Sequence, residues 1–178
     1  MIRKKICMVG LYGVGKTSLV KRYVESMFDE RYHTTIGVKI DKKDVVVEKT
    51  PVSLAIWDMA GEDEISQVKL SHLRGASGYL LVVDGCRRSS LDKALELRAR
   101  IEQQLGPLPF MLVINKADLK HQWEIDTADF ERIYKEGCHF LEASARTGDA
   151  VEAAFAGLTR TILTAGSGAG NPADDDDE

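Results

Sequence analysis

The feature that most constrains this chain is a glycine-rich turn between an apolar strand and a helix. The short apolar run Ile6–Val9 stops at residues 10–17, which read Gly-Leu-Tyr-Gly-Val-Gly-Lys-Thr, and apolar residues at helical spacing follow in residues 16–26. This is the G-x-x-x-x-G-K-[ST] pattern, after a strand and at the start of a helix as it must be. A loop whose backbone N–H groups wrap polyphosphate needs residues that tolerate tight, left-handed conformations, and the helix start adds the positive end of its dipole.

The pattern predicts a site for a nucleoside triphosphate with Mg²⁺. Lys16 can reach the outer phosphates, and the hydroxyl of Thr17 can bind the metal. A chance glycine-rich turn is the alternative, but the three glycines, the lysine–threonine pair and the flanking strand and helix all favour the phosphate site. The motif does not choose the base.

Strand-like apolar runs alternate with helical patterns along the rest of the chain. Further strands are predicted at residues 45–47, 54–57, 79–83, 110–114 and 139–141, and further helices at 91–105, 127–136 and 149–163. A tight turn at Lys49-Thr50-Pro51 indicates a hairpin between the second and third strands. The pattern therefore predicts an α/β fold of the P-loop NTPase type, with a mostly parallel six-stranded sheet, one antiparallel strand and helices on both faces.

The chain divides by composition into one domain and a short tail. Its 178 residues suit a single domain, which we place at residues 1–164. Residues 165–178 are rich in glycine and end in an acidic run, so we expect a disordered tail that cannot bury enough apolar surface to order itself. A docking role for this tail is the alternative.

Charge and cysteine usage limit the partners and the compartment. A formal net charge of -4 argues against a nucleic-acid partner held by bulk electrostatics. Three scattered cysteines, Cys7, Cys86 and Cys138, fit a reducing, cytoplasmic location, where small buried apolar residues are their expected role. No apolar run approaches the roughly 20 residues of a membrane span, and no prenylatable cysteine stands at the end, so we expect no intrinsic membrane anchor.

A second motif chooses the base. Asn115-Lys116-Ala117-Asp118 comes directly after the predicted strand at residues 110–114. An ionised aspartate only accepts hydrogen bonds, so it can take two from the N–H and amino edge that guanine has and adenine lacks. Asn and Asp are common in turns, which makes this motif weak alone. Downstream of a phosphate loop and directly after a strand, it indicates guanine.

Two other enzyme classes fit less well. A P-loop kinase needs an arginine-rich lid over both substrates, and the arginines of this chain are scattered. An ATPase is opposed by Asn115–Asp118 and by Ser144-Ala145.

The chain resembles the Ras superfamily of small GTPases, nearest its Rab and Rho branches, over about residues 3–164. Besides the two motifs above, the resemblance rests on Phe28, Thr34-Thr35-Ile36-Gly37, Trp57-Asp58-Met59-Ala60-Gly61 and Glu142-Ala143-Ser144-Ala145-Arg146. In order and spacing these are similar to the five nucleotide-binding motifs of that family.

The resemblance implies a role for each matching residue. Asp118 would pair with the guanine N1–H and amino group, Asn115 would brace its loop and contact N7, and Lys116 would lie along the base plane. Backbone N–H groups of Ser144 and Ala145 would meet the guanine O6. The implied nucleotide-binding residues are Gly10, Tyr12, Gly13, Val14, Gly15, Lys16, Thr17, Ser18, Phe28, Thr35, Gly61, Asn115, Lys116, Asp118, Ser144, Ala145 and Arg146.

Two of these assignments have a qualification. Arg146 stands where the family usually has lysine, and its flat guanidinium can still stack on the base. Phe28 would pack edge-on against the base, although an ordinary core aromatic after the first helix is the alternative.

The resemblance also implies an order–disorder switch. Thr17, Thr35 and Asp58 would hold Mg²⁺, Asp58 through water, and Thr35 would do so only when the γ-phosphate is present. The Gly61 N–H would contact the γ-phosphate, and segments 29–40 and 62–75 would meet effector or regulator proteins. Lys16, Thr35, Gly61 and Glu62 form the implied catalytic set. The implied cofactors are GTP or GDP and Mg²⁺.

Two departures from the family pattern predict slow GTP hydrolysis. Glu62 stands where the family usually has a glutamine that orients the attacking water, and Tyr12 replaces a small residue of the phosphate loop. Three alternatives stay open: Glu62 belongs to a solvated acidic run, Glu62 is a general base, or the Tyr12 hydroxyl holds the water. A guanine-nucleotide-binding scaffold with essentially no hydrolysis is the alternative function.

Overall fold

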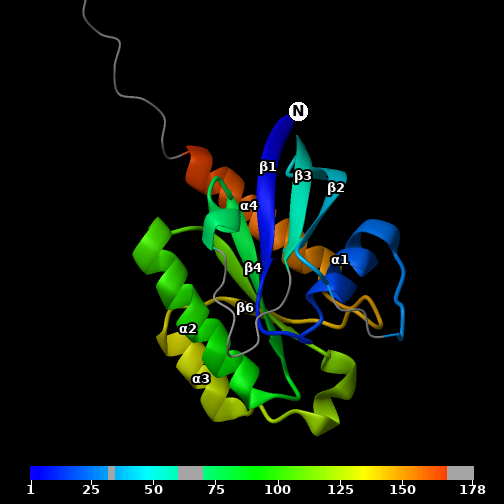
Figure 1. Ribbon diagram of the computed structural model, residues 1–178, viewed down its shortest axis with the longest axis vertical. Helices are drawn as coiled ribbons and strands as arrows, with labels where there is room; N and C mark the ends of the chain where they lie inside the picture. The colour runs from blue at the N-terminus through cyan, green and yellow to red at the C-terminus, as the bar shows by residue number, and fades with distance from the viewer. Residues whose placement is uncertain (32–34, 60–69, 168–178) are drawn as a thin grey trace, which may run out of the picture.

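The computed structural model of this protein describes residues 1–31, 35–59 and 70–167, and it shows a twisted sheet covered by helices on both faces (Figure 1). The sheet order is β2-β3-β1-β4-β5-β6, with β2 antiparallel to β3 and all other neighbours parallel. The strands are β1 (Ile2–Val9), β2 (Val38–Val47), β3 (Thr50–Met59), β4 (Gly78–Asp84), β5 (Phe110–Asn115) and β6 (Phe140–Glu142). The predicted α/β fold is confirmed, including its six strands and single antiparallel member.

Alternation along the central strands separates two apolar cores. Ile6 and Met8 of β1 face one side, while Cys7 and Val9 face the other, and all four are buried. Because both faces of such a strand are covered, its sequence is apolar at every position rather than at every second one.

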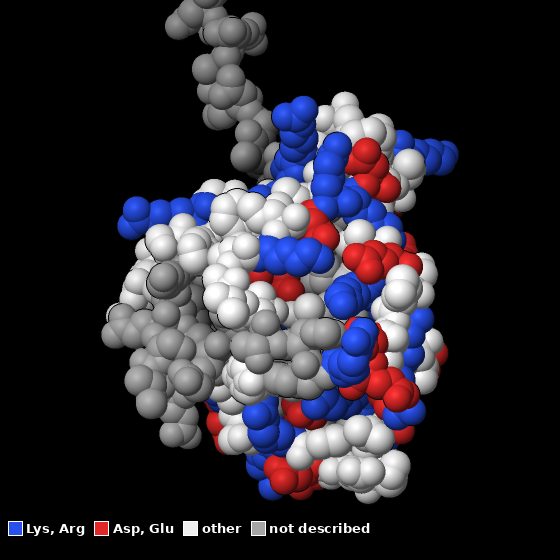
Figure 2. Space-filling model, turned by 45° about the vertical axis from the view of Figure 1, so that its right-hand side comes forward, with Lys and Arg blue, Asp and Glu red and all other residues white. Residues whose placement is uncertain are grey.

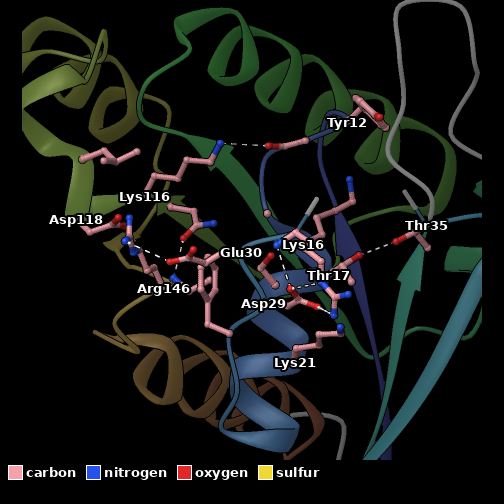
Figure 3. Close-up of a pocket in the computed structure, with 18 of the residues that line it drawn as sticks. Tyr12, Lys16, Thr17, Lys21, Asp29, Glu30, Thr35, Lys116, Asp118 and Arg146 are labelled. Atoms are coloured by element: carbon pink, nitrogen blue, oxygen red, sulfur yellow. Dashed lines mark hydrogen bonds and ion pairs between the residues drawn. The ribbon is translucent and has the colours of Figure 1, made fainter. Parts of the chain in front are cut away.

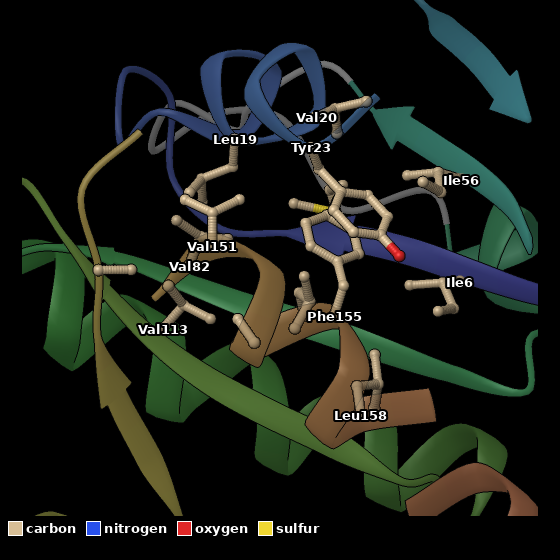
Figure 4. Packing of buried hydrophobic residues seen from close by; sticks show 14 of the residues in the cluster. Ile6, Leu19, Val20, Tyr23, Ile56, Val82, Val113, Val151, Phe155 and Leu158 are labelled. Carbon is tan, nitrogen blue, oxygen red and sulfur yellow. The ribbon is translucent and has the colours of Figure 1, made fainter. Parts of the chain in front are cut away.

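In the described part of the chain, four α-helices cover the two faces of the sheet. They are α1 (Lys16–Glu25), α2 (Arg88–Leu105), α3 (Thr127–Lys135) and α4 (Val151–Ser167). α1 and α4 pack on one face, where the rings of Tyr23 and Phe155 stack with centroids 3.9 Å apart (Figure 4). α2 and α3 pack on the opposite face, and the Arg132–Asp92 ion pair joins them (Figure 1).

Several predicted boundaries were wrong. α4 begins at Val151 and runs to Ser167, four residues beyond the predicted end at 163; of the added residues, Ala165 has the strongest helix propensity. The hairpin turn is Glu48-Lys49, both with positive φ, and not Lys49–Pro51. Two short 3₁₀ helices, η1 (Leu70–Leu73) and η2 (Ala117–Gln122), were not predicted.

The edge strand β2 is much longer than its predicted apolar part. Five of the seven residues 38–44 are charged, and Ile40 is more than half exposed. An edge strand with lysines and aspartates resists pairing with other chains. Because the segment is not apolar, its strand could not be predicted from apolar runs in the sequence.

Two observations concern the surface. Basic and acidic side chains are interspersed on the face shown in Figure 2. Within the described ranges, no helix is both long enough and apolar enough to cross a bilayer.

The strand order places the site. The chain leaves β1 toward β3 on one side, and β4 lies on the other side, so the carboxyl end of β1 is a topological switch point. Open α/β sheets bind ligands in the crevice at such points. The carboxyl ends of β1, β4 and β5 therefore lie near the start of α1, at the edge of the sheet where these parallel strands end.

Candidate guanine-nucleotide site

A pocket of about 310 Å³ lies at that edge. It is elongated, with Lys116, Asp118 and Arg146 at one end, Thr17 and Thr35 at the other, and Lys16 between them (Figure 3). Most of the predicted nucleotide-binding residues line it: Tyr12, Gly13, Gly15, Lys16, Thr17, Ser18, Phe28, Thr35, Asn115, Lys116, Asp118, Ala145 and Arg146. Its dimensions and its two chemically distinct ends suit a nucleotide.

Close packing explains two glycines of the phosphate loop. A Cβ atom on Gly10 would lie 2.5 Å from the carbonyl oxygen of Val82, and one on Gly15 would lie 2.2 Å from Nδ2 of Asn115. Gly15 also has a φ of +103°, which an L side chain rarely adopts. The loop can therefore approach β4 and Asn115 only with glycine at these positions.

Lys16 lies in the middle of the pocket. It is nearly buried, and its Nζ donates hydrogen bonds to the carbonyl oxygens of Gly10 at 2.7 Å and Leu11 at 3.0 Å. The positively charged ammonium group is thus enclosed by the phosphate loop, where the negative charge of a bound polyphosphate would compensate it.

Three oxygens converge at the other end. The Thr17 hydroxyl donates to Oδ2 of Asp58 at 2.7 Å, and the hydroxyl oxygens of Thr17 and Thr35 are 2.6 Å apart. A hydroxyl carries one proton, so Thr35 donates to Thr17 in this arrangement. The structure thus brings together the three residues predicted to hold Mg²⁺, which are distant in sequence.

The donor set at this end fits Mg²⁺. Oδ1 of Asp58 is buried and accepts no hydrogen bond from the described residues. Burial raises the pKa of this carboxyl above its ordinary value, against the lowering effect of the Thr17 hydrogen bond. Mg²⁺ prefers hard oxygen ligands and binds through one or two carboxylates together with substrate phosphates. A single carboxylate beside two hydroxyls matches that preference.

Asn115 links the two ends of the pocket. Its Nδ2 donates to the Val14 carbonyl at 3.0 Å, and its Oδ1 accepts from the Ala145 N–H at 3.1 Å. Because the residue is buried, both bonds are shielded from water. One amide thereby fixes the phosphate loop relative to the base-binding loop.

Asp118 is held in place by Ser144. The Ser144 hydroxyl donates to Oδ1 of Asp118 at 2.7 Å, which orients the carboxylate at the base end of the pocket. The Ser144 N–H donates to the Asp149 carbonyl, and the Ala145 N–H to Asn115. The predicted contact of these N–H groups with guanine O6 would therefore require an existing bond to be shared or exchanged.

Two arginines stabilise the loop that follows β6. Arg22 of α1 donates through Nε to the carbonyl of Ala145 at 2.8 Å and through its terminal nitrogen to the carbonyl of Arg146. The Arg146 guanidinium lies 3.5 Å from Glu30 across the pocket mouth. Phe28 lines the pocket and also packs against the α1–α4 core, so the two roles considered for it are compatible.

Sequence reasoning missed Asp84 and Trp123. Asp84 ends β4 and forms a 2.7 Å ion pair with Lys116, whose Nζ also lies 3.4 Å from the Gly13 carbonyl. Trp123 donates through Nε1 to the Lys116 carbonyl and packs flat against Gly85. The one available signal was the position of Asp84, at the carboxyl end of an apolar strand beside the phosphate loop.

Several predicted residues lie outside the described ranges. Gly61 and Glu62 are among them, as are residues 32–34 of the first predicted switch segment and 62–69 of the second. Their predicted roles stay predictions. Tyr12 is described, and 41% of its surface is exposed.

The fold and the phosphate loop define a P-loop protein. A Ras family model matches residues 5–164. The chain belongs to the Ras family, whose members are GTPases that bind guanine nucleotides.

Two curated relatives illustrate the branch. The chain is 36% identical to "Ras-related protein Rab-4" of Dictyostelium discoideum over 162 residues, which is 90% of this chain and 79% of that protein. It is 37% identical to "Ras-related protein Rab-18-B" of Danio rerio over 164 residues, 89% of this chain and 78% of that protein. The expected resemblance to the Ras superfamily, on its Rab side, is confirmed.

Proposed function

We propose that this GTPase is a Mg²⁺-dependent molecular switch with slow intrinsic GTP hydrolysis. The observation that carries the proposal is the convergence of Thr17, Thr35 and Asp58 at one end of a pocket whose other end holds Asp118. Thr35 precedes β2 in the chain, whereas Thr17 lies in α1. A metal held by both therefore ties the first switch segment, residues 29–40, to the phosphate site.

Each residue has a defined task in this proposal. With nucleotide bound, the Lys16 ammonium would exchange its carbonyl partners for the outer phosphates, and Thr17 and Asp58 would hold the metal, Asp58 through water. Bound Mg²⁺ supplies positive charge that neutralises the phosphates. Thr35 engages only with the triphosphate, so hydrolysis releases its segment and ends recognition by an effector or regulator.

We attribute the slow hydrolysis to Tyr12 of the phosphate loop and to Glu62, which lies outside the described residues. The Glu62 carboxylate can accept a hydrogen bond from the attacking water but cannot donate one to the transferring phosphoryl group, and its charge opposes the γ-phosphate. Tyr12 lines the pocket and places a bulky ring where the family has a small residue. A scaffold that binds guanine nucleotide without hydrolysing it is the second candidate, and the same two residues favour it.

We further propose that the protein acts in the cytoplasm through protein partners at segments 29–40 and 62–75. Ile36, in the first of these segments, is 91% exposed, which suits a protein contact. On the face shown in Figure 2, basic and acidic side chains of the described residues are mixed, which is unlike the basic face of a nucleic-acid-binding protein.

One experiment tests the proposal in three steps. The nucleotide that co-purifies is identified, its dissociation is timed in Mg²⁺ and in chelator, and GTP hydrolysis is followed in a single turnover. We expect GDP or GTP, faster dissociation in chelator and slow hydrolysis. Equal dissociation in Mg²⁺ and chelator would contradict the roles of Thr17, Thr35 and Asp58 together. Complete absence of turnover would favour the scaffold.

A further inference from the structure

The backbone carbonyl groups of the phosphate loop accept hydrogen bonds from side chains at consecutive positions. Five consecutive carbonyls, at residues 10–14, each accept a hydrogen bond from a side chain. Lys16 donates to the first two, Lys116 to the fourth at 3.4 Å and Asn115 to the fifth at 3.0 Å. The next carbonyl, that of Gly15, accepts the first bond of α1 from the Leu19 N–H.

The third carbonyl of the series is held by a residue outside every motif considered so far. A terminal nitrogen of Arg87 donates to the carbonyl oxygen of Tyr12 at 2.6 Å. Arg87 precedes α2 and is 75 residues away from Tyr12 in the chain. Its Nε is buried and makes no hydrogen bond within the described part of the chain. A guanidinium whose Nε is buried is not a freely solvated surface group.

Peptide geometry connects this contact to the phosphate site. In a trans peptide the C=O and N–H of one unit point in opposite directions, and no peptide bond in the described residues is cis. The Tyr12 carbonyl and the Gly13 N–H belong to one such unit. A carbonyl held outward by Arg87 therefore turns the Gly13 N–H inward, and Gly13 lines the pocket.

The charge of Arg87 adds to this effect. A cation at the carbonyl oxygen polarises the peptide unit, and hydrogen bonds in a chain strengthen one another. The Gly13 N–H thus becomes a better donor toward an anion. A neutral side chain at position 87 would supply no comparable polarisation.

The turn that carries Arg87 is itself rigid. The Arg87 N–H donates to the Asp84 carbonyl at 2.9 Å, and the buried Ser90 donates to the Arg87 carbonyl through both its N–H and its hydroxyl. Asp84 also pairs with Lys116, which reaches the Gly13 carbonyl. One turn after β4 therefore supports two adjacent carbonyls of the phosphate loop.

We infer that Arg87 is a positioning residue for nucleotide phosphates, acting through the Tyr12–Gly13 peptide. This inference rests on the proposed phosphate site and adds a residue to it. Because the contact uses a backbone carbonyl, it does not depend on the tyrosine ring. Arg87 does not line the pocket and is not expected to contact the nucleotide.

The test measures dissociation of a fluorescent GDP in Mg²⁺ from wild type, Arg87→Ala, Arg87→Lys and Arg160→Ala. Arg160 is a matched control, since it is an exposed arginine of α4 whose partner is Glu48. We expect Arg87→Ala to release GDP about three- to tenfold faster, which corresponds to the net contribution of an ordinary hydrogen bond because the contact is partly exposed to solvent. Arg87→Lys should restore part of the loss, and Arg160→Ala should match wild type.

A second readout separates positioning from stability. The Gly13 amide signal in the NMR spectrum of ¹⁵N-glycine-labelled protein should be displaced in Arg87→Ala and move back toward wild type in Arg87→Lys. Unchanged GDP release, or faster release with an unmoved Gly13 signal, would overturn the inference while leaving the proposed function intact. Failure of wild type to bind GDP would instead remove the proposed function and this inference with it.

Discussion

At the residue scale, the site depends on a few polar atoms whose orientation is fixed by a neighbour. Ser144 orients Asp118, Asn115 joins two loops, and Thr17 links Thr35 to Asp58. The base and the hydrolysis rate can be tested separately.

The first residue-scale prediction concerns the base. Asp118→Asn should lose guanine nucleotides and gain xanthine nucleotides, because the new amide presents a donor where the base edge must now accept. The cost for GTP should be on the order of 2–3 kcal/mol. Competition binding with GTP, xanthosine triphosphate and ATP measures it. A variant that is merely destabilised would lose all three, and wild type binding ATP within tenfold of GTP would show the base assignment to be wrong.

The second residue-scale prediction concerns hydrolysis. Single-turnover rates are compared for wild type, Glu62→Gln, Tyr12→Gly and the double variant. We expect the double variant to be fastest, with Glu62→Gln alone limited by the tyrosine ring. Wild type proving the quickest of the four would mean that Glu62 or Tyr12 is catalytic, with its role the reverse of the one proposed.

At the element scale, the connection between β1 and α1 is the critical part. The loop is pressed against β4 at Gly10 and against the end of β5 at Gly15, so its shape depends on strands far away in the chain. α1 then begins within this loop, and its own packing against α4 through Tyr23 and Phe155 fixes the direction in which the loop leaves the sheet.

Gly15→Ala tests this dependence. The new Cβ would meet Asn115 at 2.2 Å, at a φ of +103°. We expect nucleotide affinity to fall at least about tenfold, since both ends of the pocket depend on Asn115, and the free energy of unfolding to fall by about 1–3 kcal/mol. Gly106→Ala is the matched control, because Gly106 has a φ of +79° with open space around it. It should lower stability by about 1 kcal/mol and leave affinity unchanged. Equal losses of affinity would contradict the role of Asn115.

At the scale of the whole molecule, the described fold is one sheet with a core on each face. We placed the domain boundary at residue 164, and this boundary stays a prediction, although α4 continues to Ser167. Deletion of residues 168–178 should leave GDP affinity and melting temperature nearly unchanged, because that segment has no large apolar side chain to dock. Thermal unfolding with and without GDP measures it. A fall of several degrees would show that the tail packs on the domain.

Local chemistry by itself determined the fold class, the phosphate loop and the base motif of this protein. The phosphate loop, with its glycines and the Lys16-Thr17 pair, occupies eight consecutive residues, and the base motif occupies the four residues 115–118. Buried strands can be recognised as short apolar runs. Such signals are short in sequence because one turn or one strand makes each of them. The alternation of strands and helices then left few ways to arrange the sheet.

The tertiary structure alone decided how these parts are held. Asp84 meets Lys116 across 32 residues, and Arg87 meets Tyr12 across 75. Neither contact has a local pattern, because each depends on strand order, which places β4 between β1 and β5. The first part of β2 was also not predicted from the sequence, because this edge strand pairs through its backbone and carries charged side chains. The physical reason is the same for the two side-chain contacts: a contact between distant segments costs chain entropy that only the assembled sheet offsets, so it leaves no spacing in the sequence to find.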